Sequence, residues 1–311
     1  MSYIKTFFLS TFILLVLFVG LIWSIDPYNR LGNNVFNFET KAVAQSRENK
    51  FYQLESSQKK YSAFILGSSA AHRYPTQVVN ELTGYITYNY AVQHSTPMDY
   101  LAQTKHIINR FQPKLILMQL DFAGFDQNYK VDNRLFNSPL KKYLREQKAT
   151  KVLFNNDLFT LDALRDSLRV IFVNLFGKAR HIYLEDGNYI YEERKKTDHI
   201  KIKQSTDPNY DFAYDRLDII RDIIDLCNEK NIKLIIFTSP LSLNHLKIIL
   251  DNPKLKAQHD IFITELQKLS SSFFNFQTED ISKYSNYLYF HNSSHPTQEL
   301  SEIVLRKILI K

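Results

Sequence analysis

Glycine and cysteine are both scarce in this chain. Only 7 of its 311 residues are glycine, well below the roughly 7% of an average protein. The sequence has neither a G-x-G-x-x-G fingerprint nor a G-x-x-x-x-G-K loop, which argues against nucleotide-dependent chemistry of those kinds. The single cysteine, Cys227, excludes an intramolecular disulfide and a cysteine-based zinc site. We expect no cofactor.

A strong excess of one charge is also missing. The 39 basic and 32 acidic residues leave a net charge of +7. The densest charged run, at 192–196, mixes Glu, Arg and Lys, as a solvated loop does. No nucleic-acid-binding motif accompanies the positive charge, so we expect no nucleic-acid partner. Affinity for anionic polymers or lipid headgroups is the alternative.

One long uncharged run lies near the amino terminus, from Phe7 to Ile25. At about 1.5 Å per residue, a helix of this length spans roughly 28 Å, near the thickness of a bilayer core. Lys5 precedes the run and Trp23 lies near its end. These features predict a single-pass anchor in the lipid bilayer, with a cytoplasmic amino terminus and an exported domain. A cleaved signal peptide is the alternative, but no small-x-small cleavage pattern follows. A buried helix of a soluble protein is a third interpretation.

Strands alternate with amphipathic helices after a predicted stalk at 26–60, which includes a helix at 41–54. We expect strands at 63–66, 85–91, 115–120, 232–237 and 273–276, and helices at 96–110, 212–230, 261–269 and from Pro296 to the end. This alternation predicts an α/β fold with a three-layer, mostly parallel sheet. The domain at 61–311 contains a predicted insertion at about 126–209, with a helix at 158–176 and a strand at 188–191. Cys227 falls on the apolar side of its helix and is expected in the core.

Side chains with acid–base or nucleophilic chemistry follow several of these strands. They are Ser69, His94, Asp121 and Ser239, and the loop before the last helix adds His291, Asn292 and His295. Sites in parallel sheets form beyond the carboxyl ends of the strands. Ser69 and His295 are therefore expected to meet there as nucleophile and base.

A serine after a strand is more often a helix cap than a nucleophile. Gly67, placed just before Ser68 and Ser69 in a glycine-poor chain, indicates a backbone constraint at this turn. Backbone N–H groups of a helix beginning at Ser69 are suited to stabilising an oxyanion.

Several motifs resemble those of one family. Gly67-Ser68-Ser69 resembles the Gly-Asp-Ser block of SGNH (GDSL-type) hydrolases, and Asn292-Ser293-Ser294-His295-Pro296 resembles their closing Asp-x-x-His-Pro block. The Asp26-Pro27-Tyr28 element, the segment from Asn89 to Pro97 and Leu120-Asp121-Phe122 are similar to a membrane-anchored, exported subset. That subset includes the teichoic-acid D-alanyl transfer protein and the alginate O-acetylation proteins.

The resemblance implies an SGNH-type fold and an esterase or O-acyltransferase acting on acyl groups of cell-envelope glycans. Ser69 would be the nucleophile, His295 its base and Asn292 the residue that orients the imidazole. Groups near His94, Asp121 and His72 would bind the oxyanion or substrate. An envelope polysaccharide or an acyl-carrying membrane protein would be the partner.

Two departures from the family motifs matter. His94 stands where the family has glycine, and Asn292 stands where it has aspartate. In a serine-protease triad, replacing the aspartate by asparagine lowers turnover by about 10⁴. Glu279 or Asp280 is a candidate replacement for the carboxylate. The alternative function is therefore a catalytically inactive scaffold that binds a glycan or a partner in an envelope assembly.

The remaining candidates have competing interpretations. Asp121 would repel an oxyanion, so we expect it to cap the end of its strand. His72, beside Arg73, is expected to form a surface pair, with contact to an anionic substrate as the alternative. His291 and His295 have the spacing of metal ligands on a helix, but the residues between them indicate a loop and no third ligand is visible. We therefore expect no metal. His245 is expected at the rim of the sheet, near substrate.

Overall fold

The computed structural model describes residues 2–28, 35–36, 38, 46–144, 159–177, 181–191, 209–278, 290–292 and 294–310. The chain divides into two compact units. Unit 1 contains residues 1–57 and 148–183, and unit 2 contains residues 58–147 and 184–311. The predicted limits of the anchor, stalk and insertion stay predictions.

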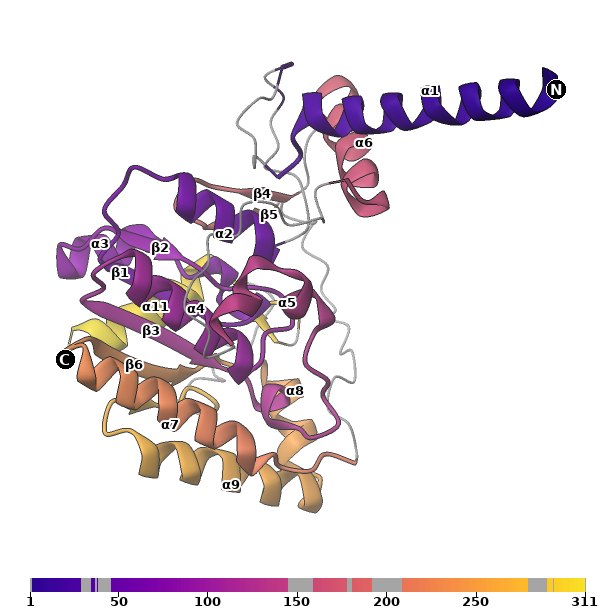
Figure 1. Ribbon diagram of the computed structural model, residues 1–311. Coiled ribbons are helices and arrows are strands. Elements are labelled where there is room, and N and C mark those ends of the chain that lie inside the picture. The colour runs from indigo at the N-terminus through magenta and orange to yellow at the C-terminus, as the bar shows by residue number, and fades with distance from the viewer. Residues whose placement is uncertain are drawn as a thin grey trace. The chain divides into compact units, whose positions relative to one another are not determined.

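Unit 1 contains three described helices and one short strand. They are α1 (Ser2–Ile25), α2 (Ser46–Ser56), α6 (Leu161–Phe176) and β4 (His181–Tyr183). Among the described residues, only the helix at Tyr3–Ile25 is long and apolar enough to cross a membrane. This helix is consistent with the predicted single-pass anchor, while the side of the membrane on which the rest of the chain lies stays a prediction. The carboxyl-terminal part of α1 contacts α6 (Figure 1).

Unit 2 is built on a five-stranded sheet in which every pair of neighbouring strands is parallel. Its strands are β1 (Ala63–Leu66), β2 (Thr87–Asn89), β3 (Leu115–Leu120), β6 (Lys233–Thr238) and β7 (Phe273–Phe274), in the order β2-β1-β3-β6-β7. The predicted α/β fold with a parallel sheet is confirmed. After β1 the chain forms β2 on one side of β1, and then β3 on its other side. The direction of the connections therefore reverses between β1 and β3, and the carboxyl ends of these two strands flank a topological switch point.

Helices flank the sheet. They are α3 (Thr76–Thr83), α4 (Pro97–Arg110), α7 (Tyr214–Glu229), α8 (Leu243–Leu250), α9 (Pro253–Leu269) and α11 (Gln298–Leu309). Alternate residues of β1, β3 and β6, such as Ile65, Leu117 and Phe237, form one core with residues of α3 and α11. The intervening residues, such as Phe64 and Ile116, are equally buried. Both faces of the sheet are therefore covered, as near-continuous apolar strands require.

Shorter elements complete unit 2. They are the 3₁₀ helices η2 (Ser69–Arg73), η3 (Phe122–Phe125) and η4 (Pro139–Tyr143), the helix α5 (Asn133–Asn137), and the strands β5 (Tyr189–Tyr191), β8 (Phe290–Asn292) and β9 (His295–Pro296). Cys227 is fully buried in α7, as predicted, and burial raises its thiol pKa to about 12. A thiol with this pKa stays protonated at neutral pH.

Several sequence-based elements need correction. The sequence did not reveal α3 or α8, and α9 begins at Pro253 rather than at 261. The last helix starts at Gln298, with Thr297 as its N-cap, because Pro296 belongs to β9. The segment before that helix, predicted to be a loop, contains β8 and β9, which pair antiparallel.

Candidate active site

The turn after β1 explains why a glycine is needed there. A Cβ atom added to Gly67 would lie 2.5 Å from Cβ of Ala71 and 2.7 Å from Oε1 of Gln119. Such separations are too short for any side chain. Only glycine lets β1 pass this close to both η2 and the end of β3, which brings the next residues to the rim of the sheet.

Ser68, rather than Ser69, caps the short helix that follows. Its Oγ accepts a hydrogen bond from the backbone N–H of Ala70 at 3.1 Å. Its own backbone N–H donates to Oε1 of Gln119 at 3.0 Å. Because Ser68 performs the capping role, the helix does not use the hydroxyl of Ser69, its first residue.

Ser69 and His295 are close enough to share a proton. Oγ of Ser69 lies 2.8 Å from Nε2 of His295, although the two residues are 226 positions apart in sequence. His295 reaches the site from β9, which contacts η2. Both side chains are half-buried. The structure thus brings together the two residues that the sequence placed at one rim, and their catalytic roles stay predictions.

The other ring nitrogen of His295 faces a residue that sequence reasoning missed. Oγ of Ser294 lies 3.2 Å from Nδ1 of His295. The sequence assigned this orienting position to Asn292. The backbone of Asn292 ends β8, but its side chain lies outside the described residues. The only feature of the sequence that pointed to Ser294 as a partner of the imidazole was its position next to His295.

Burial and two neighbouring basic side chains affect the pKa of His295. Burial, followed by the charges of Arg73 and His94, lowers the pKa of His295 from 6.5 to about 4. The imidazole is therefore neutral at neutral pH and can accept a proton. Glu279 and Asp280, the candidate replacements for the missing carboxylate, lie outside the described residues.

Asp121 supports the turn and makes no capping bond. Nε2 of Gln119 donates to Oδ1 of Asp121 at 2.6 Å, so one amide side chain links the end of β3 to the backbone of Ser68. Burial raises the pKa of Asp121, and hydrogen bonds from Ser68 and Gln119 oppose that rise. Asp121 is at the N-cap position of η3, but its side chain forms no cap hydrogen bond. The carboxylate therefore bonds to Gln119 at the end of β3 and does not cap η3.

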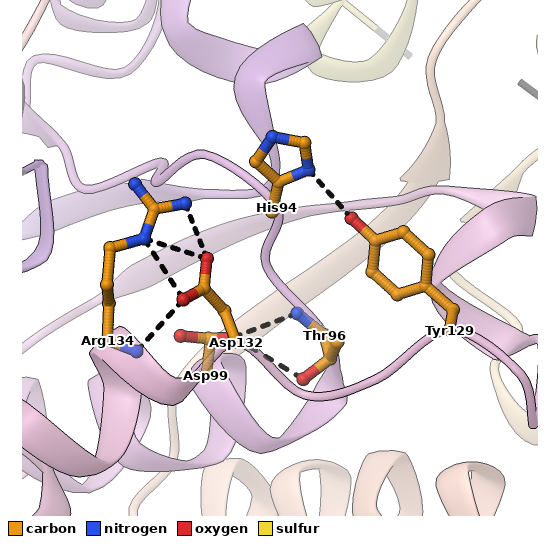
Figure 2. A network of polar contacts seen from close by, with 6 residues as sticks. All are labelled: His94, Thr96, Asp99, Tyr129, Asp132 and Arg134. Atoms are coloured by element: carbon orange, nitrogen blue, oxygen red, sulfur yellow. Dashed lines mark hydrogen bonds and ion pairs between the residues drawn. The ribbon is translucent and has the colours of Figure 1, made fainter.

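His94 occupies a backbone conformation that favours glycine. Its φ is +53°, in the left-handed region that non-glycine residues rarely adopt. Its Nδ1 lies 3.0 Å from the hydroxyl of Tyr129 (Figure 2). The SGNH motif that the sequence resembles has glycine at this position, and glycine would adopt this left-handed backbone without strain.

Two further polar contacts lie in the neighbourhood of His94 (Figure 2). Asp99 accepts a hydrogen bond from the backbone N–H of Thr96 at 2.9 Å and completes a capping box at the start of α4. Arg134 pairs with Asp132, with Nη2 and Oδ2 2.5 Å apart, and this carboxylate raises the pKa of the guanidinium.

Three other candidate side chains, which the sequence placed at the surface or at the rim of the sheet, are buried. His72 is buried in η2, with its ring 5.2 Å from that of Tyr189, so the expected surface pair is wrong. Ser239 is buried, with Oγ 3.2 Å from the hydroxyl of Tyr74. His245 is buried near the start of α8 rather than exposed at the rim. These polar side chains are packed in the interior.

No group of three His, Cys, Asp or Glu side chains is placed to hold a metal ion in the part of the chain that the structure describes. The side chain of His291, which the sequence paired with His295, lies outside that part. The absence of a metal site stays a prediction.

Comparisons with known proteins find relatives only among solved structures. No family model and no curated protein sequence matches the chain. A GDSL-like lipase from Bacteroides thetaiotaomicron is similar, with 10% identity, a TM-score of 0.41, and coverage of 86% of this chain and 98% of the lipase. An acetyl xylan esterase has 10% identity and a TM-score of 0.40 over 79% of this chain and 97% of the esterase. The esterase EstA of Pseudoalteromonas sp. has 11% identity and a TM-score of 0.37 over 80% and 93% of the two chains. With these low scores, the functional argument rests on the side chains of this chain.

Proposed function

We propose that this chain is a membrane-tethered serine esterase or O-acyltransferase that uses Ser69 and His295. The observation that carries the proposal is the 2.8 Å separation between Oγ of Ser69 and Nε2 of His295. His295 takes the proton of Ser69 as Oγ attacks the carbonyl carbon of an ester. The alcohol leaves with that proton, and the acyl group stays on Ser69. Water or a sugar hydroxyl then attacks the acyl-enzyme and gives its proton to His295. His295 passes that proton to Oγ as the bond to the acyl group breaks, which restores Ser69.

The surroundings support roles for other groups. A neutral His295 is in the form that a general base requires. Ser294 holds the ring through Nδ1. The backbone N–H groups of Ser69 and His94 would bind the oxyanion, since N–H groups at such turns stabilise developing negative charge. Asp121 is a positioning residue, which acts through Gln119 and Ser68 on the turn that carries Ser69.

The proposed substrate and location follow from the sequence motifs. The apolar helix α1 would tether the chain to the bilayer, with the site on the extracytoplasmic side. The substrate would be an acyl ester on a cell-envelope glycan, delivered by the polysaccharide itself or by an acyl-carrying membrane protein.

A catalytically inactive scaffold is the second candidate function. It is favoured by the surroundings of His295, because burial and then the neighbouring Arg73 lower the pKa of its imidazole. An imidazolium would form less readily here than beside a carboxylate. In this function the same rim would bind a glycan or a partner without turnover.

Labelling with a fluorophosphonate tests the nucleophile. The full chain in detergent should be labelled, Ser69→Ala should not, and His295→Ala should be labelled much more slowly. Ser239→Ala is the matched control, because Ser239 also follows a strand but is buried, and its labelling should equal that of the native chain. Equal labelling of Ser69→Ala would reject Ser69 as the nucleophile. Turnover of p-nitrophenyl acetate that disappears in His295→Ala would reject the scaffold.

A further inference from the structure

Helix α6 is joined to the carboxyl-terminal end of α1 in unit 1 (Figure 1). The two helices share a small apolar core made of Ile22, Ile25, Tyr28, Ala163 and Val170. The hydroxyl of Tyr28 also donates to Oδ2 of the buried Asp166 at 2.9 Å. One face of α6 is therefore fully used in packing against α1 and the residues that follow it.

The opposite face of α6 is exposed and mainly apolar, and Arg165 also falls on it. Five large side chains on it are each more than half exposed: Leu161, Leu168, Phe172, Leu175 and Phe176. At about 100° per residue, the first four lie within roughly 60° of one another around the helix. We call these five residues the apolar stripe. A stripe of this size is more than an ordinary water-facing helix exposes, and it indicates a partner surface.

Two features indicate which partner the apolar stripe binds: the place along α1 where α6 packs, and the basic residues on and after α6. The 24 residues of α1 extend about 36 Å, whereas a bilayer core is about 30 Å thick. If α1 spans the membrane, its last turns reach the headgroup region, and α6 packs on those turns. Arg165 and Arg169 are exposed on α6, and Lys178 and Arg180 follow it in sequence. Basic residues beside an apolar face are typical of helices that lie at an anionic lipid surface.

We propose that α6 is a second membrane contact, with the apolar stripe inserted at the headgroup–acyl boundary beside the end of α1. This inference rests on the membrane span that forms part of the proposed function. Two elements distant in sequence would then hold unit 1 at the bilayer, and anionic lipid would strengthen the contact. The occupant of the stripe is lipid, rather than a second copy of the chain.

Tryptophan fluorescence tests this directly, since Trp23, near the end of α1, is the only tryptophan. The native chain and the variant Trp23→Phe/Phe172→Trp are reconstituted in vesicles of equimolar phosphatidylcholine and phosphatidylglycerol. Part of the lipid is brominated near the headgroup end of its acyl chains, and unbrominated vesicles give the reference intensity. We expect Trp23 and the tryptophan introduced at position 172 to be quenched to a comparable extent. The matched control, Trp23→Phe/Tyr214→Trp, changes an exposed residue of α7 and should be quenched several-fold less.

The outcomes separate this inference from the anchor on which it rests. Quenching of Trp23 without quenching at 172 overturns the role of α6 and leaves the anchor standing; a dimer in those vesicles would then indicate that a second copy covers the stripe. Equal quenching of the tryptophans introduced at positions 172 and 214 would also overturn the role of α6. An unquenched Trp23 refutes the anchor and the inference together. Quenching at 172 that is the same in phosphatidylcholine alone removes the role assigned to the basic residues.

Discussion

The hydroxyl of Ser294 lies 3.2 Å from Nδ1 of His295, while Ser69 lies at the ring's other nitrogen. Each ring nitrogen of His295 therefore has a serine hydroxyl within hydrogen-bond distance. A neutral hydroxyl can fix the orientation of the ring, but it cannot balance the charge of an imidazolium as a carboxylate does. We therefore expect Ser294 to act as a positioning residue for the ring of His295.

Ser294→Ala should reduce kcat by about five-fold and leave KM nearly unchanged. The expected factor corresponds to the loss of one neutral hydrogen bond, about 1 kcal/mol, in a group that does not contact the substrate. Steady-state hydrolysis of p-nitrophenyl acetate measures both constants. Ser294→Thr retains a hydroxyl and should restore most of kcat. A variant whose KM changes and whose kcat does not would contradict a positioning role.

The rate of ester hydrolysis should fall as the pH drops through about 4. Burial, Arg73 and His94 lower the pKa of His295 to about 4, and only the neutral ring accepts a proton. Because Arg73 lowers this pKa, Arg73→Gln should move the acid limb of the kcat/KM profile to higher pH. Arg221→Gln, a change on the outer side of α7, is the matched control and should leave the limb in place. An acid limb that stays near pH 6.5 in the native chain would contradict the burial argument.

Gly67→Ala should destabilise the fold and remove activity. The added Cβ would lie 2.5 Å from Cβ of Ala71 and 2.7 Å from Oε1 of Gln119, and relieving such overlap typically costs about 1–3 kcal/mol. Urea unfolding measures the change. Gly177→Ala is the control, because no atom lies within 4 Å of its added Cβ, and it should unfold like the native chain. Equal stability of the two variants would contradict the close approach at the turn.

Gln119→Glu should destabilise the turn by about 1–3 kcal/mol. It would replace the donor that faces Oδ1 of Asp121 at 2.6 Å with a second carboxylate oxygen. Asp121→Asn supplies a new donor at the same place, so the double variant should recover much of the loss. A double-mutant cycle in urea measures this coupling. Additive effects of the two changes would show that these side chains do not interact.

His94→Gly should fold at least as readily as the native chain, whereas His94→Val should lose about 1–2 kcal/mol. The reason is the left-handed φ of +53°, which glycine adopts freely and a β-branched residue adopts only with strain. Thermal unfolding compares the two. Equal stabilities would mean that the backbone changes conformation when His94 is replaced.

The sequence predicted the sheet well because its strands are buried on both faces. Runs such as 63–66 and 115–120 are almost continuously apolar, and each begins and ends within a residue of the prediction. The helix α3 was missed because only Thr76, Val78 and Val79 of its eight residues are buried, too few to show a helical period. The hairpin of β8 and β9 was missed because its strands are three and two residues long.

At the candidate site, the motifs identified Ser69 and His295 but not the residues that hold them. Gln119 lies inside an apolar strand, and a lone amide there gives no sign of its two hydrogen bonds. The bond from the backbone of Ser68 depends on how β1 and β3 are aligned in the sheet, with Leu66 opposite Met118. Ser68 and Ser69 are likewise indistinguishable by composition, and only the geometry of the turn separates the cap from the candidate nucleophile.

Both margins of the sheet are short. β2 has three residues and β7 has two, so a strand from another molecule would find little exposed backbone to pair with. The backbone N–H of Asn89, in β2, already donates to the carbonyl of Asp186 at 2.8 Å. Unit 2 should therefore resist edge-to-edge aggregation through this sheet at the concentrations used for purification.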